Sequence, residues 1–180
     1  EQRKRAKAIN FGIVYGIGGY SLGNDIGVSK KAADEYIKKY LATYPKIAAY
    51  LENVKAQAKI DGYVTTMYGR RRYIPELQSS KKQLVSFGER VAMNTPIQGA
   101  AADIIKKAMV DTSKALEAEG MKASIILQIH DELIIECPSH EAEKAKTLLV
   151  HCMENAFQLK APLIADAHIG KNWFDAKNEQ

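Results

Sequence analysis

The chain has 180 residues, of which 46% are hydrophobic, and a formal net charge of +5. This length allows one ordinary domain or parts of two, and no apolar run is long enough to span a membrane. Cys137 and Cys152 have neither a metal-binding spacing nor the number that a disulfide framework needs, so we expect core thiols in a reducing compartment. Residues 1–75 hold 14 Lys/Arg against 6 Asp/Glu, and residues 76–180 hold 12 against 15. The basic leading part suits phosphate-containing partners.

The first expected element is a helix that begins before Arg3 and gathers cations and aromatic rings on one face. At about 100° per residue, Lys4, Phe11 and Tyr15 fall within roughly 40° of one another. Arg3 and Lys7 lie on the adjoining flank. Cations neutralise phosphates and a ring can stack on a base or sugar, so this face predicts a nucleotide site. A solvated face above core aromatics is the alternative interpretation of this segment alone.

The remaining elements follow from local signals along the chain. The glycine-rich stretch 16–20 ends the first helix and is not a phosphate-binding loop, because it follows no strand and lacks the Gly-Lys-Ser/Thr ending. Ser29 is placed to cap the next helix, and Pro96 is expected to interrupt a long helical segment. Residues 69–72, one glycine and three arginines, are expected to form the basic turn of a hairpin. The arginines are either a solvated turn or a phosphate contact, and we favour the contact. We expect helices over residues 3–16, 30–43, 45–60, 81–94, 97–119 and 139–157, hairpins over 63–74 and 124–137, and a last strand over 163–169.

The hairpin of residues 124–137 is the second segment that suggests chemistry. Two runs rich in Ile and Leu flank the polar break His130, Asp131 and Glu132. Adjacent carboxylates repel each other unless they are solvated or bridged by a cation, and magnesium takes carboxylate and phosphate oxygens together. A plain polar turn is the alternative. In one chain with the cationic helix, the carboxylates indicate metal-assisted phosphoryl chemistry.

Four motifs occur in order along nearly the whole chain. They are Arg3-x3-Lys7-x3-Phe11-Gly12-x2-Tyr15-Gly16, then Arg90-x3-Asn94-x-Pro96-x-Gln98-Gly99-x-Ala101-Ala102-Asp103, then His130-Asp131-Glu132, and the tail Gly170–Lys177. Together they resemble the family A DNA polymerases, of the bacterial DNA polymerase I type. The resemblance implies an α+β fold. A helical, fingers-like part over residues 1–98 would carry the nucleotide-binding helix and the basic hairpin. A palm-like part over 99–180 would carry the carboxylate hairpin in an antiparallel sheet with helices on one face.

The resemblance implies how the first helix would bind an incoming dNTP. Arg3 and Lys7 would hold the triphosphate. Phe11 would pack against the sugar and base, and Phe rather than Tyr implies discrimination against a sugar that lacks the 3′-hydroxyl. Tyr15 would lie beside the template base and the nascent pair. Family members commonly carry Arg at the position of Lys4, and this exchange keeps a charge but loses the planar fork.

The same resemblance implies template-directed DNA synthesis, in replication and repair, with primer–template DNA and dNTPs as partners. Asp131 and Glu132 would be the ligands of Mg²⁺, and Lys7 would complete the catalytic set with them. The residues that would contact the primer–template are Arg90, Asn94, Gln98 and His130. We expect a cytoplasmic, nucleoid-associated protein that is a monomer and has no membrane partner.

One motif of the family has no counterpart in this sequence. The family holds its metal pair with two separated aspartates, and the first lies in an Asp-Tyr-Ser-like segment upstream of the cationic helix. One metal ion activates the 3′-hydroxyl and another steadies the leaving oxygens, so Asp131 and Glu132 cannot hold both alone. We therefore expect the chain to be a fragment of a larger polymerase domain and to be inactive by itself.

Three other functions remain open at this point. A single-subunit RNA polymerase shares the Lys-bearing helix and the His-Asp pair, although Phe11 and Glu132 favour the DNA enzyme. A non-catalytic nucleic-acid-binding module would need the DNA-contacting residues but not Asp131. A magnesium nuclease would need more clustered carboxylates than this chain contains.

Overall fold

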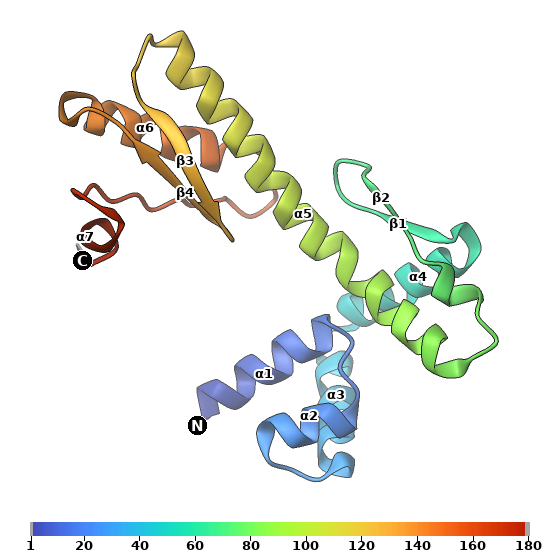
Figure 1. Cartoon of the computed structure of the whole chain (residues 1–180). Helices are drawn as coiled ribbons and strands as arrows, with labels where there is room; N and C mark the ends of the chain where they lie inside the picture. The colour runs from blue at the N-terminus through green and yellow to red at the C-terminus, as the bar shows by residue number, and fades with distance from the viewer. Residues whose placement is uncertain (1, 179–180) are drawn as a thin grey trace. The chain divides into compact units, whose positions relative to one another are not determined.

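The computed structural model describes residues 2–178 and is shown in Figure 1. The chain divides into two compact units, Glu1–Ala100 and Ala101–Gln180, and helix α5 (Lys82–Ala118) contributes to both. Helices and two separate two-stranded antiparallel sheets make up the structure, so the predicted α+β fold class is confirmed. Within the described residues, no helix combines the length and the apolar character needed to cross a membrane.

The first unit contains most of the helices. Ser29 caps α3 as predicted, because its side chain accepts a hydrogen bond of 3.3 Å from the amide of Ala32. Besides the start of α5, the unit contains α1 (Gln2–Val14), α2 (Gly19–Ile26), α3 (Lys30–Thr43), α4 (Pro45–Asp61), β1 (Tyr63–Thr65), β2 (Arg71–Tyr73) and the short helix η1 (Pro75–Gln78). Gly69, with φ 76°, lies in the turn as predicted, but Arg71 and Arg72 lie on strand β2 rather than in the turn.

Helix α2 was not expected, because its glycines look like helix breakers. Close packing requires glycine at position 23, whereas a side chain at position 19 would only have to shift the exposed carboxylate of Asp34. A Cβ on Gly19 would lie 1.9 Å from the Oδ1 atom of Asp34 on α3, and one on Gly23 would lie 2.7 Å from a backbone carbonyl oxygen. Leu22 and Ile26 are buried together with Ala33 of α3. Tertiary packing therefore overrides the low helix propensity of glycine in this segment.

The prediction of two helices separated at Pro96 was wrong, because α5 continues through it. Proline removes one amide donor and its ring crowds the carbonyl four residues back, so packing must hold the segment helical. Thr95 is buried, and its hydroxyl donates a hydrogen bond of 2.7 Å to the carbonyl of Val91. Ala92 packs against Val64 in a core cluster formed with α4 and the hairpin. This packing holds the segment helical despite the missing bond.

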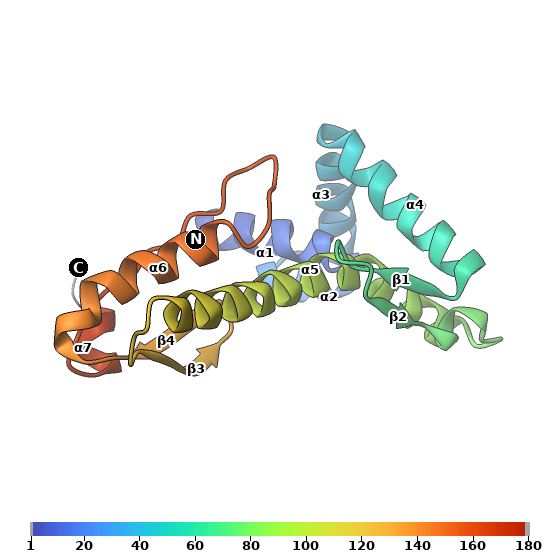
Figure 2. The ribbon, with the colours of Figure 1, turned by 90° about the horizontal axis from the view of Figure 1, so that it is seen from above.

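The second unit is built on the predicted hairpin. It contains β3 (Ser124–Ile129), β4 (Glu132–Glu136), η2 (Ser139–Glu141), α6 (Ala142–Glu154) and α7 (Trp173–Asn178), besides the end of α5. Figure 2 shows α6 and this part of α5 on the same side of the hairpin. Leu133 of β4 packs there with Ala108 of α5 and Leu149 of α6. The carboxylate of Glu141 accepts hydrogen bonds from the amides of Lys122 and Ala123 and ties η2 to the start of β3.

The predicted last strand over residues 163–169 was also wrong. Exposure does alternate along this segment, as the sequence pattern indicates, but the segment pairs with neither strand of the hairpin. The amide of Ala165 donates instead to a carboxylate oxygen of Glu154 at 3.1 Å. An alternating pattern reports an extended backbone with one covered side, and a strand needs a partner as well.

Candidate nucleotide and nucleic-acid site

Helix α1 exposes its cations and the ring of Phe11, and the ring of Tyr15, in the turn after the helix, is exposed as well. Phe11 is 54% exposed and Tyr15 is 41% exposed, while Ile13 is the buried residue of the helix. The two rings are stacked with centroids 6.4 Å apart, and the ammonium of Lys7 lies 5.7 Å from the centroid of the Phe11 ring. Arg3 and Lys4 are exposed on the same helix. The alternative in which these rings belong to the core does not fit their exposure.

A hollow of about 590 Å³ in the first unit brings three of the predicted residues together; we call it the aromatic hollow. Phe11 comes from α1, Tyr15 from the turn that follows this helix, and Arg90 from the first half of α5. The other lining residues are Ala8, Gly12, Ile17, Gly18, Ser21 and Asp25. Sequence reasoning missed Ser21 and Asp25 because they lie on α2, which was not expected. The spacing of Leu22 and Ile26 was the available signal for that helix.

Arg90, Asn94 and Gln98 follow one another at helical spacing on the uninterrupted α5, so they share one side of it. The guanidinium of Arg90 donates to the hydroxyl of Ser86 at 3.1 Å. The Oδ1 atom of Asn94 is buried and accepts no hydrogen bond from the described residues. A buried acceptor without a donor is costly, and because this atom is inaccessible from outside, its missing partner does not by itself indicate a ligand.

The second unit presents the predicted carboxylates at a tight turn. Ile129 pairs with Glu132, so His130 and Asp131 form a two-residue turn and Glu132 begins β4. His130 has φ 52°, in the left-handed region that non-glycine residues seldom occupy. Its carbonyl accepts a hydrogen bond of 2.7 Å from the side chain of Gln128. All three residues of the polar break are exposed. The strained turn therefore presents them outward together.

A cation from the tail lies beside one of these carboxylates. The ammonium of Lys177 on α7 lies 3.5 Å from a carboxylate oxygen of Glu132 and 5.6 Å from the centroid of the Trp173 ring. In the part of the chain that the structure describes, no group of three or more His, Cys, Asp or Glu side chains could hold a metal ion. Asp131 and Glu132 are thus a pair of hard oxygen donors that needs further ligands to complete a divalent site.

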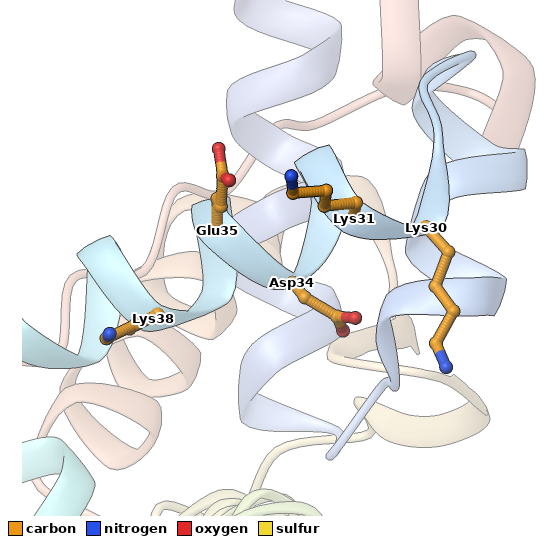
Figure 3. Close-up of a pocket in the computed structure, with 5 residues that line it drawn as sticks. All are labelled: Lys30, Lys31, Asp34, Glu35 and Lys38. Atoms are coloured by element: carbon orange, nitrogen blue, oxygen red, sulfur yellow. The ribbon is translucent and has the colours of Figure 1, made fainter.

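A second hollow, of about 400 Å³, lies along α3 and is shown in Figure 3. Its lining residues are Lys30, Lys31, Asp34, Glu35 and Lys38. The five side chains spread from the helix in different directions and do not converge on one point (Figure 3). Mixed charge of this kind is typical of a solvated helix surface, and we assign this hollow no chemistry.

Comparison with known proteins identifies the class. The chain matches DNA polymerase family A over residues 1–175 and belongs to that family. It is 50% identical over 175 residues to DNA polymerase I of Bacillus caldotenax and of Bacillus subtilis, covering 97% of this chain and 20% of each relative. The chain therefore spans about a fifth of the length of these relatives. A similar solved structure is the POL domain of Pol1 from M. smegmatis in complex with DNA primer-template and dNTP. Its TM-score is 0.92, with 39% identity, and the match covers 97% of this chain and 31% of that one.

Proposed function

We propose that the protein to which this chain belongs carries out template-directed DNA synthesis, transferring dNTPs to a primer 3′-hydroxyl. Membership of DNA polymerase family A supports this, together with the M. smegmatis neighbour that holds DNA primer-template and dNTP. In this proposal residues 1–98 are the fingers-like part and residues 99–180 the palm-like part. The protein acts as a cytoplasmic monomer that associates with the nucleoid.

The aromatic hollow is the single observation that carries the nucleotide part of the proposal. Phe11 and Tyr15 line this hollow and offer exposed ring surface to a sugar and base. Lys7 and Arg3 lie on α1 outside its lining, and they are proposed to supply charge for the triphosphate. Arg90 brings a further cation to the same hollow. A ligand that is both anionic and aromatic matches this combination better than a purely apolar or purely anionic one.

The primer–template is proposed to contact Arg90, Asn94 and Gln98 on α5 and His130 at the carboxylate turn. Gln98 is exposed one turn beyond Asn94 and carries both a donor and an acceptor. Non-catalytic binding would use the same residues, so the catalytic claim depends on the carboxylates.

Asp131 and Glu132 are proposed to hold Mg²⁺, which would stabilise negative charge on the reacting phosphate. Their adjacent, exposed oxygens suit a hard cation, which would have to displace the Lys177 ammonium from Glu132. Because two carboxylates do not make a two-metal site, we propose that the 180-residue chain alone does not extend primers and needs an aspartate from elsewhere in the polymerase.

Primer extension by the intact protein tests this function. Asp131→Ala should reduce extension by at least about a hundredfold while duplex binding stays close to that of the unaltered protein. Asp166→Ala, which removes an exposed carboxylate of the same unit, is the matched control and should extend normally. Lys7→Ala should weaken use of the dNTP by about ten- to a hundredfold, since it removes a charge-assisted contact. Normal extension by Asp131→Ala would favour the non-catalytic binding module instead.

A further inference from the structure

One face of the hairpin β1–β2 presents two tyrosine rings and a guanidinium; we call it the hairpin face. Tyr63 is directly opposite Tyr73, and Thr65 is directly opposite Arg71, so these four side chains lie on the same side of the two strands. The two tyrosine rings meet edge to face with centroids 5.5 Å apart. The guanidinium carbon of Arg71 lies 4.8 Å from the centroid of the Tyr63 ring. Tyr73 remains 67% exposed.

The opposite side of the hairpin explains how it is held in place without these rings. Val64 is 7% exposed and packs with Ile74 and Ala92 in a core cluster of the first unit. Arg72, directly opposite Val64, donates a hydrogen bond of 3.3 Å to the hydroxyl of Thr95 on α5. In Figure 1 the hairpin lies beside the first half of α5. The core therefore does not account for the rings of the hairpin face.

The charge of the hairpin is entirely positive. Residues 63–73 include three arginines and no Asp or Glu. A hydrogen bond with Tyr73 and the nearby phenols of Tyr63 and Tyr73 raise the pKa of Arg71, so this side chain stays cationic. Among the described residues, Arg71 contacts neutral phenols and Arg72 a neutral hydroxyl. On the hairpin face, the guanidinium of Arg71 is thus oriented by neutral partners and keeps its charge available to an anion, whereas Arg72 lies on the opposite side.

We propose that the hairpin face binds single-stranded nucleic acid. Unpaired bases offer flat faces that can stack on exposed rings while the phosphates contact guanidinium groups, whereas the bases of a duplex are stacked on one another. An acidic protein segment would satisfy the charge but not the ring surfaces. In the polymerase proposed above, the strand is the unpaired part of the template, and this assignment rests on the proposed function.

Fluorescence anisotropy with the intact protein tests the inference. The probes are labelled primer–templates with one common duplex and either a blunt end or about ten unpaired template nucleotides. Tyr73→Ala should weaken binding of the overhang probe by about five- to a hundredfold relative to the blunt probe, and Tyr73→Phe should not. Arg71→Ala should reduce the salt dependence of overhang binding by about 0.7 in logarithmic slope. Tyr36→Ala and Lys39→Ala, exposed positions on α3, are the matched controls.

Two results would overturn the inference. If Tyr73→Ala and Arg71→Ala bind the overhang probe as tightly as the α3 control variants do, the hairpin face is not a binding site. Equal loss on the blunt and overhang probes would mean that the face contacts duplex. Primer extension by the same proteins, with urea midpoints to confirm folding, separates the two proposals. If the unaltered protein fails to extend primers yet binds single strands through Tyr73, the proposed function fails and the hairpin face stands.

Discussion

Gly16 offers the sharpest test of how the aromatic hollow is built. It follows α1 with φ 71°, and a Cβ on it would lie 2.4 Å from Cε of Met93 and 3.1 Å from Cγ of Arg90. Gly27 follows α2 with φ 70°, but a Cβ there would meet nothing within 4 Å. Alanine at either position pays about 1–2 kcal/mol for the left-handed conformation. At Gly16 it must also displace Met93 or Arg90, which adds about 1–3 kcal/mol of overpacking.

We therefore expect Gly16→Ala to lower the free energy of unfolding by about 2–5 kcal/mol and Gly27→Ala by about 1–2 kcal/mol. Urea denaturation of the two variants measures the difference directly, because the backbone penalty is common to both. Since Arg90 lines the aromatic hollow, Gly16→Ala in the intact protein should also weaken dNTP use more than Gly27→Ala does. Equal losses of stability would refute the reasoning, because they would mean that neither side chain is held firmly against Gly16.

Three further outcomes are expected. Thr95→Val should lower the free energy of unfolding, measured by urea denaturation, by about 1–2 kcal/mol, because two hydrogen bonds of a buried hydroxyl are lost. Thr43→Val removes a similar bond to a backbone carbonyl at an exposed position of α3 and should cost less than about 0.5 kcal/mol. Burial, and secondarily the charge of Glu141, raises the pKa of Cys137 above its ordinary 9.0, so the folded state favours the protonated thiol and loses stability as the pH rises above about 9. Glu141→Gln should lower that pKa and speed iodoacetamide alkylation of Cys137 near pH 8.5; an unchanged alkylation profile would exclude an effect of this carboxylate. Phe11→Tyr in the intact protein should raise incorporation of dideoxynucleotides at least about tenfold in a primer-extension gel, and an unchanged ratio would remove Phe11 from contact with the sugar.

Local sequence signals were sufficient to predict those elements whose ends are set by residues within the element or next to it. Ser29 caps α3, Pro45 begins α4, and the Ile-rich runs around His130 form the carboxylate hairpin. Helix α2 was missed because its glycines are typical of helix breaks, although Leu22 and Ile26 are spaced as in a helix and pack with Ala33 of α3. Likewise, Pro96 stays helical because of buried neighbours that local propensity does not report.

The candidate site likewise has features that the sequence predicts and features that depend on distant residues. The residue types on α1 and at the carboxylate turn could be predicted, because charge, aromatic character and spacing are properties of the sequence. Their surroundings could not. Ser21 joins the aromatic hollow from the unexpected α2, and the strained φ of His130 arises from the two-residue turn. The pairing of Glu132 with Lys177 connects residues 45 positions apart, which no local pattern indicates.

The most direct test of the account is to sequence the product that the intact protein makes on a defined primer–template with all four dNTPs and Mg²⁺. The proposal predicts a primer extended by the complement of the template, and no extension when the 180-residue chain replaces the intact protein. The absence of product from the intact protein, or a product whose sequence does not follow the template, would contradict the account.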